Sequence, residues 1–129
     1  MDAKTAASAY RESAYDNAPP LKIVHMLYGG ALRFLEQAEA IDPEQDPHGF
    51  NDRLGRADGI VSELRLSLDH EKAPEVCREL SSLYLFVEDQ VRRALLDHDV
   101  SAIRPARDVL ATLDDAWRKI DVDPGQPRS

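Results

Sequence analysis

The chain has 129 residues, 43% of them hydrophobic, and a formal net charge of −8 at pH 7. This length and apolar content are typical of one globular domain built around one core. The acidic balance argues against a nucleic-acid partner, because binding to phosphates requires a surplus of Lys and Arg.

Membrane insertion and secretion are not expected from the sequence. No apolar run approaches the ~20 residues that span a bilayer. The N-terminal stretch lacks the basic start and apolar core of a secretory signal. The single cysteine, Cys77, cannot form an internal disulfide, which favours a reducing, cytoplasmic setting.

Residues 1–19 are rich in Ala and Ser, with Tyr10 and Tyr15 as their main large apolar side chains. This composition is too poor in apolar groups to fold alone, but the two tyrosines can dock the segment onto a helical core. A frayed terminus is the alternative. We therefore expect a segment that is either flexible or caps the rest of the protein, with Tyr10 and Tyr15 as candidate partner-binding residues.

Residues 20–40 carry the pattern of a long amphipathic helix. Steps of three and four residues keep side chains on one helical face, and they connect Val24, Tyr28, Ala31, Leu35 and Ala38. A second, adjacent stripe consists of Ile23, Leu27, Gly30, Phe34 and Ile41. Two adjacent stripes make an apolar face wider than one neighbouring helix covers. Either this helix lies at the centre of a bundle, or part of its face is available to a partner.

Three more segments repeat this spacing: residues 50–68, residues 75–98, and a last helix that ends at residue 120. Their stripes are Phe50, Leu54, Ala57, Val61, Leu64 and Leu68; Cys77, Leu80, Tyr84, Val87, Val91 and Ala94; and Ile103, Ala106, Leu110, Leu113, Trp117 and Ile120. Asn51 or Asp52 is predicted to cap the second helix, and Ser101 the fourth. Residues 42–49, with two prolines and a glycine, are predicted to form a loop.

Four amphipathic segments with short connections predict an all-α fold, an antiparallel up-down-up-down four-helix bundle with a loosely docked N-terminal segment. The bundle is expected to occupy residues 20–120. Residues 121–129 are polar, contain two prolines and are predicted to be a disordered tail.

The residue types that carry catalysis or bind metals do not form recognisable motifs. No Glu-x-x-His pair, cysteine pair or glycine-rich phosphate loop is present, so we expect no metal, no cofactor and no enzyme activity. The carboxylates are all interpreted as parts of solvated helix faces. His25 is the best candidate for phosphate transfer, because phosphotransfer domains are four-helix bundles with an exposed helical histidine, but it lies beside the buried stripe.

Binding through apolar surface is the remaining function class. The candidate walls of a groove for an amphipathic partner are Ile23, Leu27 and Phe34 on the first helix and Leu83 and Phe86 on the third. The alternative is that these side chains complete the core or form a dimer contact. Gly55 and Gly59, four residues apart, leave either a flat strip that another backbone can approach or a locally weak helix surface.

Short motifs along the chain resemble the flagellar export chaperones that guard flagellin, the FliS family. The first helix carries Met26-Leu27-Tyr28, Gly30-Ala31, Phe34-Leu35 and Ala38; the later helices carry Ala57, Ile60-Val61, Glu63-Leu64, Ser67-Leu68-Asp69, Leu80, Leu83-Tyr84, Ala94, Leu110, Leu113 and Ala116-Trp117. Tyr10 and Pro20 also stand where that family has a tyrosine and a proline. The resemblance extends from about residue 10 to residue 120.

The resemblance implies a non-enzymatic cytoplasmic chaperone. Members of the family bind the disordered C-terminal segment of flagellin, prevent its premature polymerisation and assist its delivery to the flagellar type III export gate. Their N-terminal segment can cover part of the apolar groove when no flagellin is bound. A histidine phosphotransfer bundle or a helical dimerisation module remains the alternative.

Overall fold

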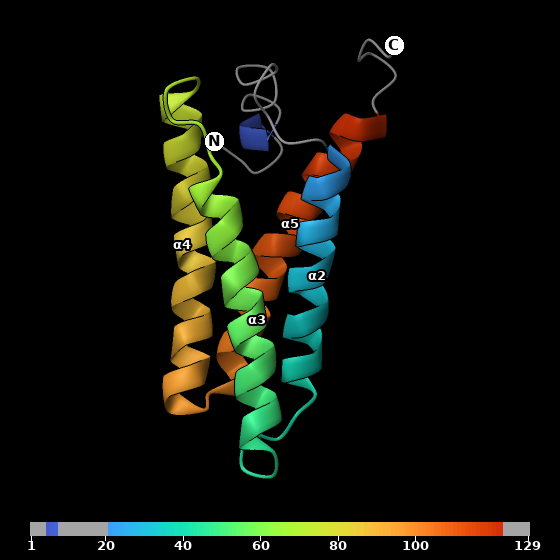
Figure 1. Ribbon diagram of the computed structural model, residues 1–129, viewed down its shortest axis with the longest axis vertical. Helices are drawn as coiled ribbons and strands as arrows, with labels where there is room; N and C mark the ends of the chain where they lie inside the picture. The colour runs from blue at the N-terminus through green and yellow to red at the C-terminus, as the bar shows by residue number, and fades with distance from the viewer. Residues whose placement is uncertain (1–4, 8–20, 123–129) are drawn as a thin grey trace.

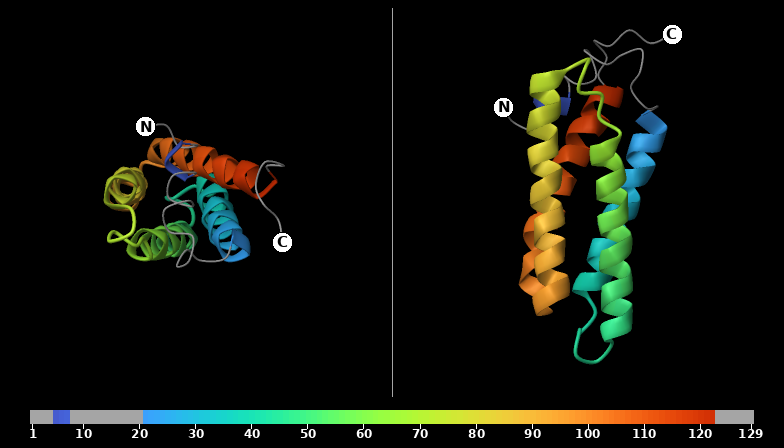
Figure 2. Two further views of the ribbon diagram at one scale, coloured as in Figure 1. Left: turned by 90° about the horizontal axis from the view of Figure 1, so that it is seen from above. Right: turned by 60° about the vertical axis from the view of Figure 1, so that its left-hand side comes forward.

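The computed structural model describes residues 5–7 and 21–122, and these residues are almost entirely helical (Figure 1). The long helices are α2 (Leu21–Glu39), α3 (Pro47–Leu66), α4 (Pro74–Asp97) and α5 (Ile103–Val122), with a short 3-10 turn, η1 (Val100–Ala102), before α5. The view along the bundle shows α2 and α4 at opposite corners, each packed between α3 and α5 (Figure 2). The predicted all-α bundle is therefore confirmed.

The α2–α3 connection is shorter than predicted, because α3 begins at Pro47 rather than at Phe50. Asp46 is the residue that caps it, and its carboxylate accepts a hydrogen bond of 2.9 Å from the backbone N–H of Gly49. A proline is tolerated in the first turn because its missing N–H would have no helical partner there. The prediction of Asn51 or Asp52 as the cap is therefore wrong.

The last connection also differs from the prediction. His98 takes a left-handed conformation, with φ of 52°, and ends α4. Asp99 then caps η1 by accepting a hydrogen bond of 3.0 Å from the backbone N–H of Ser101. Ser101 is thus the donor to the cap and not the cap itself. The helix that follows extends to Val122, two residues beyond its predicted end.

The predicted stripes form the core. Nearly all of their described side chains are buried: Val24, Tyr28, Ala31, Leu35, Ala38, Phe50, Leu54, Ala57, Val61, Leu64, Cys77, Leu80, Tyr84, Val87, Val91, Ala94, Ile103, Ala106, Leu110, Leu113 and Trp117. Leu68 is half-buried against them. The three-and-four spacing therefore identifies the inner face of every helix.

Residues 5–7 form one helical turn near the end of the bundle at which α4 begins and α5 ends (Figure 1). The side chains of Ala6 and Ala7 are fully buried and belong to the same core cluster as the long helices. This turn attaches part of the N-terminal segment to the bundle. Tyr10 and Tyr15 lie outside the described residues.

Three aromatic side chains from different helices form a buried hydrogen-bonded chain. The hydroxyl groups of Tyr28 and Tyr84 are 2.5 Å apart, and the indole N–H of Trp117 donates to the Tyr28 oxygen at 3.1 Å. Burial, followed by the proximity of Tyr84, raises the pKa of Tyr28 well above its usual value of 10.0. The chain of bonds ties α2 to α4 and α5, because each bond joins two helices.

Replacing Tyr28 with phenylalanine is expected to lower the free energy of unfolding by about 1–3 kcal/mol, because Tyr84 and Trp117 both lose a buried partner. Tyr84→Phe is expected to cost less, since the Trp117 bond to Tyr28 remains. Urea titration at neutral pH measures both. Equal costs for the two variants would show that Tyr28 is not the centre of the chain of bonds.

A buried ion pair joins α3 to α4. Glu88 has no exposed surface, and its carboxylate accepts hydrogen bonds of 2.7 Å from both the Ser62 hydroxyl and the Arg65 guanidinium. The expectation that all carboxylates occupy solvated faces is therefore wrong for Glu88. It is also wrong for Asp114 on α5, which is only 7% exposed.

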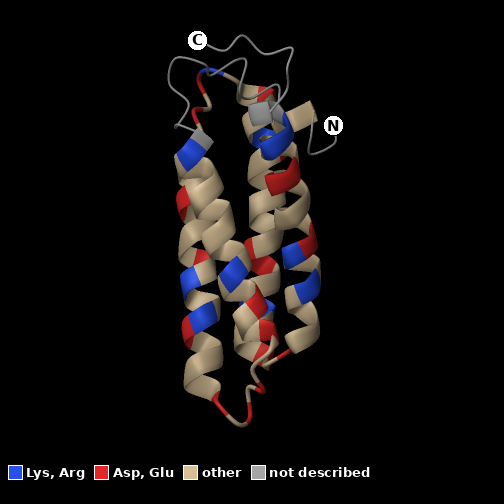
Figure 3. Ribbon diagram, turned by 90° about the vertical axis from the view of Figure 1, so that its right-hand side faces the viewer, with Lys and Arg blue, Asp and Glu red and all other residues tan. Residues whose placement is uncertain are grey.

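The outer surface carries both signs of charge. Figure 3 shows Lys and Arg interleaved with Asp and Glu along the helices, and carboxylates in the α2–α3 loop at the lower end. None of the helices within the described part of the chain combines the length and the apolar content that crossing a bilayer requires.

Candidate partner-binding surface

A shallow groove of about 320 Å³ runs between α2 and α3. Its apolar lining comes from Leu27 and Phe34 on α2 and from Ile60 on α3, all of which are only partly buried. Arg56, Gly59 and Glu63 complete the lining. Leu27 and Phe34 are two helical turns apart, so the groove follows the axis of α2. We call these six residues the α2–α3 groove.

Two glycines allow this groove to form. A side chain at Gly30 on α2 would place its Cβ 3.3 Å from the Ile60 side chain, so this position favours close approach of α2 and α3. Gly59 on α3 leaves the groove open, because no described atom lies within 4 Å of the position its Cβ would take. Gly55, one turn earlier, is equally open. Gly55 and Gly59 therefore leave open space on the surface of α3, which fits a flat strip and a locally weak helix surface equally.

Charged groups border the apolar lining. The Arg56 guanidinium lies 5.9 Å from the centre of the Phe34 ring and is held by Asp52, whose carboxylate is 3.1 Å from Arg56 Nε. The hydrogen bond from Arg56 lowers the pKa of Asp52. The groove thus combines an apolar floor with a polar rim, which is the usual composition of a surface that binds a polypeptide.

The structure does not place all predicted partner-binding residues in one groove. Ile23 is 45% exposed on α2 but does not line the α2–α3 groove. Leu83 is half-buried and Phe86 is 40% exposed, and both lie on α4, across the bundle from α2 (Figure 2). Leu27 and Phe34 line the α2–α3 groove together, whereas Leu83 packs against the core from α4. The predicted walls therefore do not form one groove.

Comparison with known proteins identifies the family. The model of the family described as flagellar protein FliS matches residues 3–124. The chain belongs to the FliS family. The flagellar secretion chaperone FliS of Salmonella typhimurium is 30% identical over 118 residues, which cover 91% of this chain and 87% of that protein. The FliS of Campylobacter jejuni is 31% identical over 120 residues, covering 93% and 94%.

A third relative agrees with these two. The FliS of Escherichia coli is 31% identical over 109 residues, which cover 84% of this chain and 80% of that protein. The matches include the helices that form the α2–α3 groove, because they extend over most of the chain. The resemblance inferred from short motifs is therefore confirmed at the level of the FliS family.

The histidine singled out from the sequence is poorly placed for phosphate transfer in this FliS-family bundle. Both ring nitrogens of His25 are buried, whereas a phosphodonor must reach one of them. Burial also raises the pKa of the Cys77 thiol, which makes it a weak nucleophile. No group of three or more metal-ligating side chains is found in the described ranges 5–7 and 21–122.

Four of the groove-lining residues were not among the predicted partner-binding residues of this FliS-family chain: Arg56, Gly59, Ile60 and Glu63. Ile60 lies one residue before the core residue Val61, so it widens the apolar face of α3. Leu27, one residue before the core residue Tyr28, widens the apolar face of α2 in the same way. An apolar residue directly beside a core stripe on each of two helices is the signal that could have identified the groove from sequence.

Proposed function

We propose that this protein is a cytoplasmic, non-enzymatic chaperone that binds the disordered C-terminal segment of flagellin in the α2–α3 groove. Binding keeps flagellin from polymerising prematurely and assists its delivery to the flagellar type III export apparatus. Membership of the FliS family supports the flagellar partner. The observation that carries the location is the partly exposed apolar lining formed by Leu27, Phe34 and Ile60.

The physical demands of such a partner match this surface. A segment that folds on binding loses conformational entropy, so it must bury apolar area to bind tightly. Leu27, Phe34 and Ile60 offer apolar side chains along two helical turns, and Arg56 and Glu63 offer charges at the rim. An amphipathic segment placed along α2 can contact both kinds of group at once.

Calorimetric titration of the full chain with the C-terminal segment of its cognate flagellin tests the proposal. We expect one segment per chain, a dissociation constant that is micromolar or tighter, and a negative heat-capacity change from apolar burial. Absence of binding at high micromolar concentrations would overturn the proposed function.

Filling the groove is expected to weaken this binding without unfolding the bundle. Gly59→Phe places a large side chain where nothing lies within 4 Å of the Cβ position, and it removes a helix-destabilising glycine. We expect the affinity for the flagellin segment to fall about tenfold or more. The same titration measures it, and thermal melting checks the fold.

Gly55→Phe is the matched control for this variant. Gly55 has the same open surroundings one turn away on α3 but does not line the groove. Its substitution is expected to change the affinity less than threefold. Equal losses for the two variants would place the binding site outside the α2–α3 groove.

A further inference from the structure

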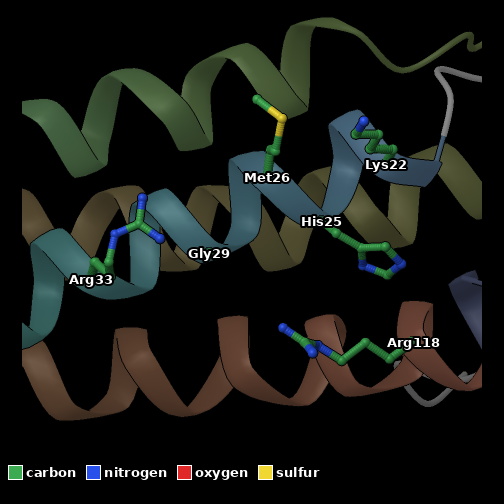
Figure 4. Close-up of a pocket in the computed structure, with 6 residues that line it drawn as sticks. All are labelled: Lys22, His25, Met26, Gly29, Arg33 and Arg118. Atoms are coloured by element: carbon green, nitrogen blue, oxygen red, sulfur yellow. The ribbon is translucent and has the colours of Figure 1, made fainter.

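A second depression, of about 620 Å³, is lined by residues of α2 and α5 (Figure 4). Its lining is mainly basic: Lys22, His25, Met26, Gly29 and Arg33 come from α2, and Arg118 comes from α5. In Figure 4, His25 extends from α2 toward α5, and Arg118 extends from α5 toward α2. We call these six residues the basic groove.

Two of its cations are available to a ligand. Arg118 is paired with Asp114, whose carboxylate is 3.1 Å from Arg118 Nε. Lys22 and Arg33 are exposed, and no ion pair to either is found within the described residues. In a chain with a net charge of −8, two unneutralised cations beside a depression make a local site for negative charge.

The geometry of the basic groove requires an elongated ligand. Lys22 and Arg33 are separated by about 16 Å along the helix axis, which is too far for one small anion to contact both. Met26 lies between them and is 64% exposed, which makes it a flexible apolar contact. A ligand that satisfies this surface therefore carries negative charges near its ends and apolar groups between them.

Polar atoms of His25 and of its neighbour Asp114 on α5 lack hydrogen bonds in the part of the chain that the structure describes. Both ring nitrogens of His25 and the Oδ1 atom of Asp114 are buried and have no hydrogen-bond partner within the described part of the chain. His25 Nδ1 and Asp114 Oδ1 are 3.7 Å apart. Because these atoms are shielded from solvent, the contacts to an occupant come from Lys22, Arg33 and Met26 instead.

We propose that the basic groove docks an acidic, amphipathic segment of a partner polypeptide. Its carboxylates pair with Lys22 and Arg33, and its apolar side chains cover Met26. The two grooves share no lining residue, so this docking site is distinct from the α2–α3 groove. A polypeptide fits better than a nucleic acid, because it can place apolar side chains over Met26 between two carboxylates, whereas a nucleic acid carries a charge on every phosphate.

The test uses a fluorescent helical peptide with two glutamates eleven residues apart and leucines on the same face between them. Fluorescence anisotropy with the full chain at low salt is expected to show saturable binding, and replacement of both glutamates by glutamine is expected to weaken it. The double variant Lys22→Glu/Arg33→Glu is expected to weaken it about tenfold or more. Near-physiological salt is expected to reduce the affinity of the wild type.

Arg78→Glu/Arg93→Glu on α4 is the matched control. Both arginines are exposed, and the substitution changes the net charge of the chain by the same amount. We expect it to alter affinity less than threefold. The proposal is overturned if both double variants weaken binding equally, if the wild type does not bind the peptide, or if a single-stranded oligonucleotide displaces the peptide at lower concentration than unlabelled peptide does.

Discussion

Replacing Arg65 with methionine is expected to lower the free energy of unfolding by about 3–5 kcal/mol at neutral pH. The guanidinium is 28% exposed, whereas the Glu88 side chain that it holds is fully buried. Methionine keeps an unbranched apolar side chain but has neither the charge nor the hydrogen-bond donors of arginine, so the main effect is an uncompensated buried carboxylate. Breaking one side of a buried ion pair is costly for this reason.

The loss of stability caused by Arg65→Met is expected to decrease as the pH falls. Burial raises the pKa of Glu88, but the hydrogen bonds from Arg65 and Ser62, with the nearby arginine charges, together hold it below its usual value of 4.5. In the folded wild type this carboxylate therefore contributes stability above about pH 4.5, which is lost as the pH falls. Without Arg65 burial dominates and raises the pKa of Glu88, so the difference between wild type and variant should shrink as the pH falls from 7 to 4.

Urea titrations of the wild type and Arg65→Met at pH 7 and pH 4 measure both effects. Glu88→Gln is the control, since it removes the charge but keeps an acceptor for Ser62 and Arg65, and its cost is expected to be about 1–2 kcal/mol. A cost for Arg65→Met below that of Glu88→Gln, or one that is unchanged at low pH, would mean that Glu88 is hydrated in the folded protein.

Leu64→Ala is expected to cost about 2–5 kcal/mol, because it deletes buried methyl groups and leaves a cavity that the neighbouring helices only partly refill. Leu64 is 5% exposed within the core, whereas Leu66, two residues later on the same helix, is 72% exposed. Leu66→Ala should therefore change stability by less than about 0.5 kcal/mol. Chemical denaturation of both variants measures the difference, and similar costs would contradict the assigned inner face of α3.

The sequence predicts the inner faces of the helices because helical periodicity is local. A residue such as Leu64 is recognised as buried from neighbours three and four positions away. The start of α3 is harder to predict, since Pro47 and Gly49 are typical of loops and only the geometry of Asp46 shows that they belong to the helix. Local patterns therefore predict which segments are helical and which faces are buried. The residue at which a helix begins depends instead on which nearby side chain caps it.

The spacing of apolar residues does not predict which side chains of different helices contact each other. Glu88 lies one residue after Val87 and four after Tyr84, which places it on the inner arc of α4, but its partner Arg65 is on another helix. For the same reason, Phe34 is visible as a surplus apolar residue, whereas its pairing with Ile60 across the groove depends on how α2 and α3 pack.

Intermolecular nuclear Overhauser effects between the methyl groups of the chaperone and the bound flagellin C-terminal segment test the central claim most directly. The account predicts contacts from the segment to the Leu27 and Ile60 methyl groups in the α2–α3 groove, and none to Leu96, which is 84% exposed on α4. A bound segment that contacts Leu96 and leaves Leu27 and Ile60 without contacts would contradict it.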